Sequence, residues 1–313
     1  MLIKFSLRNY KVFRERVELS LVASNYDKET NEENLIDVPK FGLRLLKSAV
    51  IYGANASGKS KLIEALGYMR NFIHVSSKDS QKGDEIPVEP FRLNTTSENE
   101  PTEFEVTFIH NDVLYRYGFE ATRHEIVSEW LYYRPNTKEV ELFYRDKQDF
   151  ELHKRSFSGI VNQLVKGKNI RENALLLSVA AQFNDTRAGL VFDWFNNLRI
   201  ISGLDEEGYE GYTLELTQQP AYKRLVLHLL QVADLSIKDI IIKAIQYPHS
   251  SQPSISGSST TTTTTSGSYE QAQTIHSKYN EENQEVGSVA FSLYEDESSG
   301  TQKFFGIAAP IID

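Results

Sequence analysis

The sequence has no cysteine and no long apolar run. The missing cysteines exclude disulfides, cysteine-ligated zinc and thiol catalysis, and the seven histidines show no spacing typical of a metal site. No stretch of about 18 apolar residues occurs, and the first residues lack the basic and apolar segments of a secretory signal. We therefore expect a cytoplasmic protein that does not contact a membrane.

Positive charge is also scarce, with 34 lysines and arginines against 43 acidic residues and a net charge of −9. This balance disfavours a broad, non-specific hold on nucleic acid, which depends on clustered Lys and Arg. Two short basic clusters, His153-Lys154-Arg155 and residues 166–171, leave local contact with nucleic acid open, although such clusters are more often solvated surface. The length of 313 residues and the hydrophobic content of 40% suit one large α/β domain or a core with an insertion.

The motif that organises the sequence matches the phosphate-binding pattern G-x-x-x-x-G-K-[ST] at every fixed position. Its residues are Gly53, Ala54, Asn55, Ala56, Ser57, Gly58, Lys59 and Ser60. Residues 48–52 have the apolar character of a short buried strand, and the apolar spacing over 59–73 predicts a helix. Strand, glycine loop and helix in this order are typical of a P-loop.

The chemistry of a P-loop explains this spacing. Its two glycines let backbone N–H groups converge on a phosphate, and the following helix adds the positive end of its dipole. We predict that Lys59 bridges the β- and γ-phosphates of ATP, that the Ser60 hydroxyl ligates Mg²⁺, and that Lys61 completes the ATP-binding set. ATP and Mg²⁺ are the expected cofactors, and a glycine-rich turn without a ligand is the alternative.

Strand patterns surround the motif. Residues 2–8 and 17–21 predict an antiparallel hairpin, and residues 26–40 are polar and predict a surface loop. Further strands, predicted to form an antiparallel sheet, lie near residues 104–108, 115–119, 126–133 and 140–144. Asn111-Asp112 is the predicted turn between the first two.

The second half is first helical and then returns to strands. Helical spacing occupies parts of 157–201 and about 220–233, and strand patterns follow at 236–247, 275–279 and 289–293. Residues 248–268 are rich in Ser and Thr, and this composition predicts a flexible loop between two strands of one domain. We therefore expect three segments: 1–155 with the P-loop and the antiparallel sheet, 156–235 as a helical insertion, and 236–313 as a return to the first domain.

A second motif, Glu297-Ser298-Ser299-Gly300-Thr301-Gln302-Lys303, precedes a helical pattern over 301–312. Hydroxyls, backbone N–H groups and a helix N-terminus can together contact an anion, so this segment predicts a second phosphate contact. Taken alone, Ser-Ser-Gly is weak and usually a helix cap. The acidic residues 295–297 are expected to be surface carboxylates.

Three stretches together resemble RecF/SMC-related ABC-type ATPases: Phe5 to Phe13 at the N-terminus, Tyr52 to Ser60, and Glu297 to Lys303. Residues 115–120 and 129–133 fit the same resemblance. More narrowly, the sequence is similar to the RloA and AbiL-like ATP-binding proteins of bacterial anti-phage and abortive-infection systems, which are often grouped with AAA-family ATPases.

The resemblance implies an α/β fold, namely a P-loop ABC-type ATPase head with an antiparallel β subdomain and a helical insertion. It implies a homo-oligomer in which two heads sandwich ATP, with Ser298, Ser299, Gly300 and Gln302 of one subunit contacting the nucleotide on the P-loop of the other. It also implies a nucleotide-dependent switch or sensor in anti-phage defence that controls a separate effector protein.

In the RecF/SMC-related ATPases, the signature helix is followed by the Walker B motif, an apolar strand that ends in Asp-Glu. The given sequence reaches Asp313 without such a strand. The head is therefore expected to be truncated before Walker B, which leaves catalytic residues unassigned and ATP hydrolysis by the chain alone an open question. A Q-loop equivalent is expected near residues 90–93. A RecF-like DNA-maintenance ATPase is the alternative function, and a structural module with a degenerate site is a third.

Overall fold

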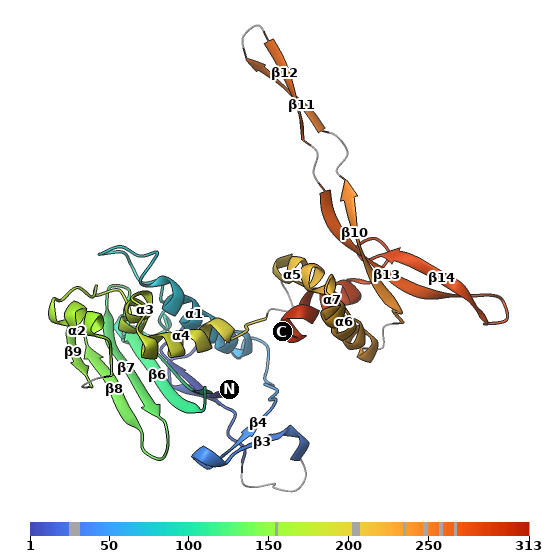
Figure 1. The fold of residues 1–313 in the computed structure, drawn as a ribbon. Helices are drawn as coiled ribbons and strands as arrows, with labels where there is room; N and C mark the ends of the chain where they lie inside the picture. Colours follow the sequence, from blue (N-terminus) through green and yellow to red (C-terminus); the bar gives the residue numbers. More distant parts are fainter. Residues whose placement is uncertain are drawn as a thin grey trace. The chain divides into compact units, whose positions relative to one another are not determined.

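The computed structural model divides into two compact units, Met1–Leu198 and Arg199–Asp313, which are described separately (Figure 1). The structure describes residues 1–24, 32–153, 156–201, 207–233, 236–246, 250–256, 259–265 and 268–312. The boundary falls inside the segment 156–235, so its first helices belong to the first unit and its last two to the second.

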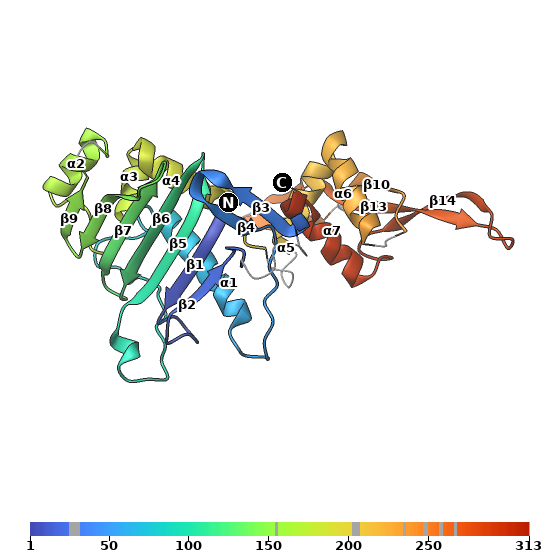
Figure 2. The same ribbon diagram turned by 90° about the horizontal axis from the view of Figure 1, so that it is seen from below.

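The first unit is built on a seven-stranded antiparallel sheet in the order β2-β1-β5-β6-β7-β8-β9 (Figure 2). Its strands are β1 (Leu2–Arg8), β2 (Val17–Ser20), β5 (Thr102–His110), β6 (Val113–Ala121), β7 (Ile126–Arg134), β8 (Val140–Asp146) and β9 (Asp149–Leu152). Asn111 and Asp112 form the β5–β6 turn with φ of 47° and 57°, the positive values of a two-residue hairpin. The predicted hairpin and antiparallel sheet are confirmed; the four-residue β9 was too short to give a clear pattern.

Helices cover one face of this sheet. They are α1 (Lys59–Val75), α2 (Gly159–Lys166), α3 (Leu176–Gln182) and α4 (Thr186–Asn197). Phe72 of α1 packs against Phe119, and Trp194 of α4 stacks on Phe108 at 4.0 Å between ring centroids. Since alternate strand residues point to opposite faces, Glu105 lies on the other face, where its carboxylate accepts hydrogen bonds from Arg16, Arg116 and Trp130.

A buried ion pair fixes α3 to the sheet. Glu129 of β7 and Arg145 of β8 are both fully buried, 3.5 Å apart. The Glu129 carboxylate also accepts hydrogen bonds from Leu176 N at 2.7 Å and Leu177 N at 3.0 Å, which are the first residues of α3. A side chain from a strand therefore caps this helix, because Leu175 at its N-cap position has no hydroxyl or carboxyl group to do so.

Two predictions for residues 26–52 are wrong. Where a surface loop was expected at 26–40, β3 (Leu35–Val38) pairs with β4 (Leu43–Leu46), although none of residues 32–40 is buried; residues 25–31 lie outside the described part. The expected buried strand at 48–52 is not a strand, and its Val50 and Tyr52 are 72% and 88% exposed. A strand needs a hydrogen-bonded neighbour, and no strand among the described residues pairs with this segment.

The second unit packs three helices on a three-stranded sheet. The helices are α5 (Glu207–Thr217), α6 (Pro220–Val232) and α7 (Ser299–Ile312), and the sheet has the order β10 (Asp239–Gln246), β13 (Ser268–Tyr279) and β14 (Glu285–Ser292). Its core joins Leu230 of α6, Ile240 of β10 and Phe305 of α7. The predicted helices at 220–233 and 301–312 and the predicted strands around 236–247, 275–279 and 289–293 are confirmed.

The Ser/Thr-rich segment 248–268 differs from the expected loop. The structure contains β11 (Ser250–Ser256) and β12 (Ser259–Thr265), which pair with each other in antiparallel register. Threonine is β-branched and suits an extended backbone, although the composition cannot supply a hydrophobic core. The segment does connect two paired strands, β10 and β13, as predicted. Residues 247–249, 257–258 and 266–267 lie outside the described part.

Candidate nucleotide-binding site

The glycine motif forms a tight loop at the start of α1. Gly58, the residue before the helix, has φ of 96°, and Ala56 has φ of 63°, so the backbone twice enters the left-handed region. A Cβ atom at Gly53 would lie 2.7 Å from Ser57 Oγ, so the two ends of the loop lie close together. A helix N-terminus preceded by such a turn presents backbone N–H groups to an anion, and this geometry fits a phosphate.

Lys59 spans this loop. Its Nζ donates hydrogen bonds to the carbonyls of Gly53 and Ala54, both at 2.7 Å. The ammonium group is therefore held next to the loop by two carbonyl oxygens. Phosphate oxygens of a ligand in the loop can replace these carbonyls as hydrogen-bond acceptors. Ser60 lies exposed on the first turn of α1, so its hydroxyl is open to a metal ion.

A contact that the sequence did not reveal supports the loop from the N-terminal side. A Cβ atom at Gly58 would lie 2.7 Å from Phe13 Cζ and 3.1 Å from Val12 Cγ2. A side chain at this position would have to displace Phe13, and the left-handed φ also favours glycine. The only signal in the sequence was the motif from Phe5 to Phe13, which carried a family resemblance without any assigned chemistry.

Lys11 ties the same N-terminal turn to α1. Its ammonium forms ion pairs with Glu64 and, at 3.2 Å, with Glu89. Burial lowers the pKa of Lys11, but the hydrogen bonds to the two carboxylates outweigh it and hold the pKa above its usual value; the bond to Lys11 in turn lowers the pKa of Glu64. Lys61 also pairs with Glu64. Of the predicted ATP-binding residues, Lys61 is therefore the one bound to a carboxylate.

The second motif begins α7 in the second unit. Ser298 Oγ accepts a hydrogen bond from Thr301 N at 3.2 Å, and Gln302 Nε2 donates to Glu297 O at 3.0 Å. Two of the four predicted signature residues therefore hold the turn together. Ser299 and Gly300 are exposed, and a Cβ atom at Gly300 would meet only Ser298 Oγ, at 3.6 Å.

The prediction of surface carboxylates at 295–297 is wrong for Glu297. Its side chain is 11% exposed and accepts a hydrogen bond from His276 Nε2 at 2.7 Å. Asp296 is exposed, but its Oδ2 accepts from Ser292 N at 2.7 Å and so closes the preceding turn. The sequence did not reveal the burial of Glu297, because its partner His276 lies on β13 and is far from it in the sequence.

Comparison with known families agrees with the loop geometry. Residues 48–312 match the family described as "AAA domain, putative AbiEii toxin, Type IV TA system". The chain belongs to this family. No curated protein matches the chain. ATPases of the AAA family generally bind ATP with Mg²⁺.

Two further observations concern membrane-spanning helices and metal-ligating side chains in this AAA-family chain. No helix in the described part is long and apolar enough to cross a membrane. The described residues also contain no group of three or more His, Asp or Glu side chains that could hold a metal ion.

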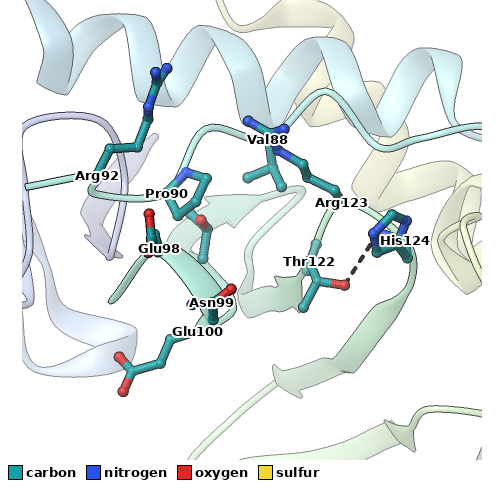
Figure 3. A pocket seen from close by; sticks show the side chains of 11 residues that line it. Val88, Pro90, Arg92, Glu98, Asn99, Glu100, Thr122, Arg123 and His124 are labelled. Atoms are coloured by element: carbon teal, nitrogen blue, oxygen red, sulfur yellow. Dashed lines mark hydrogen bonds between the residues drawn. The ribbon is translucent and has the colours of Figure 1, made fainter. Parts of the chain in front are cut away.

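The region expected to replace a Q-loop forms one wall of a cavity of about 560 Å³. Figure 3 shows Arg123 and His124 on one side of this cavity and Glu98 and Glu100 on the other. Arg92 also lines it, and no glutamine does. The cavity of this AAA-family chain is thus lined by charges of both signs.

The cavity is joined to the N-terminal turn through Asn9. The Asn9 Nδ2 group donates to the carbonyls of Ser97 at 2.8 Å and Glu100 at 2.9 Å, while its Oδ1 accepts from Phe91 N at 3.0 Å. Asn9 is 1% exposed and has φ of 54°. One asparagine therefore fixes both the segment 90–93 and the turn that supports the P-loop.

Proposed function

We propose that this protein binds ATP with Mg²⁺ at residues 53–61 and acts as a nucleotide-dependent switch. The observation that carries the proposal is the position of Lys59, whose Nζ lies 2.7 Å from two carbonyls of the loop at the N-terminus of α1. The left-handed Gly58 and the exposed Ser60 supply the other two parts of a phosphate and metal site. Membership of the AAA family supports the same ligand.

The second part of the proposal is an ATP sandwich of the RecF/SMC-related ABC type. Ser299 and Gly300 are exposed at the N-terminus of α7, a 14-residue helix, and Ser298 and Gln302 hold that turn in place. We propose that these residues contact the γ-phosphate of a nucleotide bound to the P-loop of a second copy. Association of two chains would then depend on ATP, and it would report the nucleotide state.

The defence role is also a proposal. The family description names a putative AbiEii toxin of type IV toxin–antitoxin systems, and the sequence motifs resemble RloA and AbiL-like proteins of abortive-infection systems. Both point to phage defence in which a separate partner is involved. We propose that the ATP-bound association controls such an effector protein.

We propose that Glu64 is not the catalytic base of this site. Glu64 is the acidic residue on the first turns of α1, and it is engaged by both Lys11 and Lys61. A carboxylate paired with two ammonium groups is a poor base for the attacking water, because its protonated form is disfavoured. ATP hydrolysis would therefore need a carboxylate other than Glu64.

One observation favours the alternative, a DNA-maintenance ATPase. Lys82, Lys168 and Arg171 line one cavity of about 310 Å³, with Glu172 as its only acidic residue. Such a basic hollow in an acidic protein can bind a phosphate group. The other basic cluster, 153–155, cannot be compared, since residues 154 and 155 lie outside the described part.

Two titrations test the proposal. Calorimetry with ATP and Mg²⁺ should show binding, and light scattering should show an increase in mass only when both are present. A titration with duplex DNA at several salt concentrations separates the alternative, because phosphate contacts weaken steeply with salt. Failure to bind ATP would overturn the proposed function, whereas salt-dependent DNA binding without association would favour the alternative.

A further inference from the structure

The turn between β14 and α7 is fixed by side chains from both of its ends. Asp296 accepts from the backbone of Ser292, and Gln302 donates to the carbonyls of Tyr294 at 3.2 Å and Glu297 at 3.0 Å. The turn therefore has one defined shape. That shape decides where Ser299 and Gly300 are presented.

A third set of contacts ties this turn to the middle of β13. The Glu297 carboxylate accepts hydrogen bonds through the same oxygen, Oε1, from the Thr274 hydroxyl and from His276 Nε2, the latter at 2.7 Å. Because an ionised carboxylate only accepts, the imidazole nitrogen must be the donor. Thr274 is fully buried, and the His276 ring packs on Phe291 of β14 with 4.9 Å between the ring centroids. The two donors are thus held by the sheet itself.

The orientation of the Glu297 carboxylate argues against direct contact with a nucleotide. A carboxylate that ligates a metal ion or activates water must present an oxygen to it, whereas Glu297 is 11% exposed and is directed at β13. Its neighbour Ser298 directly precedes α7, and the exposed Ser299 and Gly300 are the first two residues of that helix. Glu297 is therefore placed to position Ser299 and Gly300 and not to contact the nucleotide itself.

We infer that Thr274 and His276 are positioning residues for the second nucleotide-contacting motif, acting through Glu297. This inference rests on the proposed function, in which Ser299 and Gly300 contact the nucleotide of a second copy. Contacts to a phosphate require donors placed to within a fraction of an ångström, and a side chain anchored on a strand provides that precision. Thr274 is paired with Ile240 of β10 and with Phe291 of β14, and His276 is paired with Val289 of β14, so the sheet holds both donors of the Glu297 contact.

The test compares His276→Ala with His276→Gln, which keeps an N–H donor near the position of Nε2, and with His228→Ala as a matched control on the exposed face of α6. Three quantities are measured on the full chain. These are amide hydrogen exchange of Thr301 and Gln302, whose N–H groups bond to Ser298, the ATP concentration that drives association, and the ATP affinity of the monomer.

His276→Ala should raise exchange at Thr301 and Gln302 by about tenfold or more without raising it across α5 and α6, since only a local contact is lost. It should also weaken ATP-driven association by about tenfold at unchanged monomer affinity, a loss of about 1.4 kcal/mol. His276→Gln should recover most of both effects, and His228→Ala should resemble wild type.

Two outcomes overturn the inference: unchanged exchange in His276→Ala, or a uniform increase over the whole second unit, which would show a merely structural role. The exchange measurement decides this even if wild type does not associate. Failure of wild type to associate with ATP would instead count against the proposed sandwich, so the two failures are distinguishable.

Discussion

A Cβ atom at Gly58 would lie 2.7 Å from Cζ of Phe13, so the P-loop and the N-terminal turn meet at a glycine that also has φ of 96°. This contact makes the N-terminal turn part of the proposed nucleotide site. It also explains why a motif at residues 5–13 accompanies a P-loop that begins forty residues later in the sequence.

Gly58→Ala should destabilise the first unit and weaken ATP binding. The left-handed backbone costs about 1–3 kcal/mol for a residue with a side chain, and the clash with Phe13 adds to it. Gly83→Ala is the matched control, because Gly83 has φ of 89° but nothing within 4 Å of its Cβ position. Urea unfolding gives the two free energies. Equal losses in both variants would show that Phe13 does not restrict Gly58.

Lys59→Ala should weaken ATP binding while leaving the fold intact. Hydrogen bonds to charged groups contribute about 1.5–3 kcal/mol each, so the loss of affinity should reach at least about tenfold. Calorimetry measures it, with Lys138→Ala as a control at an exposed lysine of the same unit. Unchanged ATP affinity in Lys59→Ala would remove the assignment of the P-loop.

Ser60→Ala should bind ATP in EDTA nearly as well as wild type but lose most of the gain in affinity that Mg²⁺ provides, because the hydroxyl is proposed as a metal ligand. Parallel titrations with and without Mg²⁺ measure this difference, and Lys59→Ala should be weak in both. The same Mg²⁺ dependence in Ser60→Ala and wild type would contradict the role of Ser60.

Glu129→Ala should lower the free energy of unfolding by about 3–5 kcal/mol, because it leaves the buried Arg145 charge without its partner. The matched control is Glu139→Ala, which breaks the partly exposed ion pair with Arg116 at 2.7 Å and should cost about 1 kcal/mol or less. Urea unfolding followed by circular dichroism measures both. Similar losses in the two variants would mean that burial does not set the contribution of these pairs.

Ser299→Arg should block ATP-dependent association while the ATP affinity of the monomer stays nearly unchanged, since the bulky side chain fills the space proposed for the γ-phosphate of a second copy. Ser288→Arg places the same side chain on an exposed residue of β14 and is the control. Light scattering with ATP and Mg²⁺, run beside a phosphate-release assay, tests this. Normal association of Ser299→Arg would exclude the motif from the interface, and rapid phosphate release by wild type would show that the chain supplies its own catalytic base.

Local sequence patterns determined several strands and helices of this protein and its glycine-rich motif. The alternation of apolar residues predicted the hairpins β1–β2 and β5–β6, and the helical spacing predicted α1, because these signals depend on neighbours in the sequence. The P-loop was recognisable for the same reason, since its glycines, lysine and serine are contiguous. The prediction failed at residues 48–52. Their apolar character indicated a buried strand, but no strand among the described residues pairs with them.

Contacts between distant segments were decided by the tertiary structure alone. Phe13 against Gly58, Arg145 beside Glu129, and His276 beside Glu297 each join residues whose separation in the sequence gives no periodic signal. In each case a buried or crowded group requires a particular partner, because an unpaired charge or a clash there is costly. The sequence by itself therefore determined the residues for which we propose phosphate binding, because their motif is contiguous, and the packing of the sheets and helices decided how those residues are held.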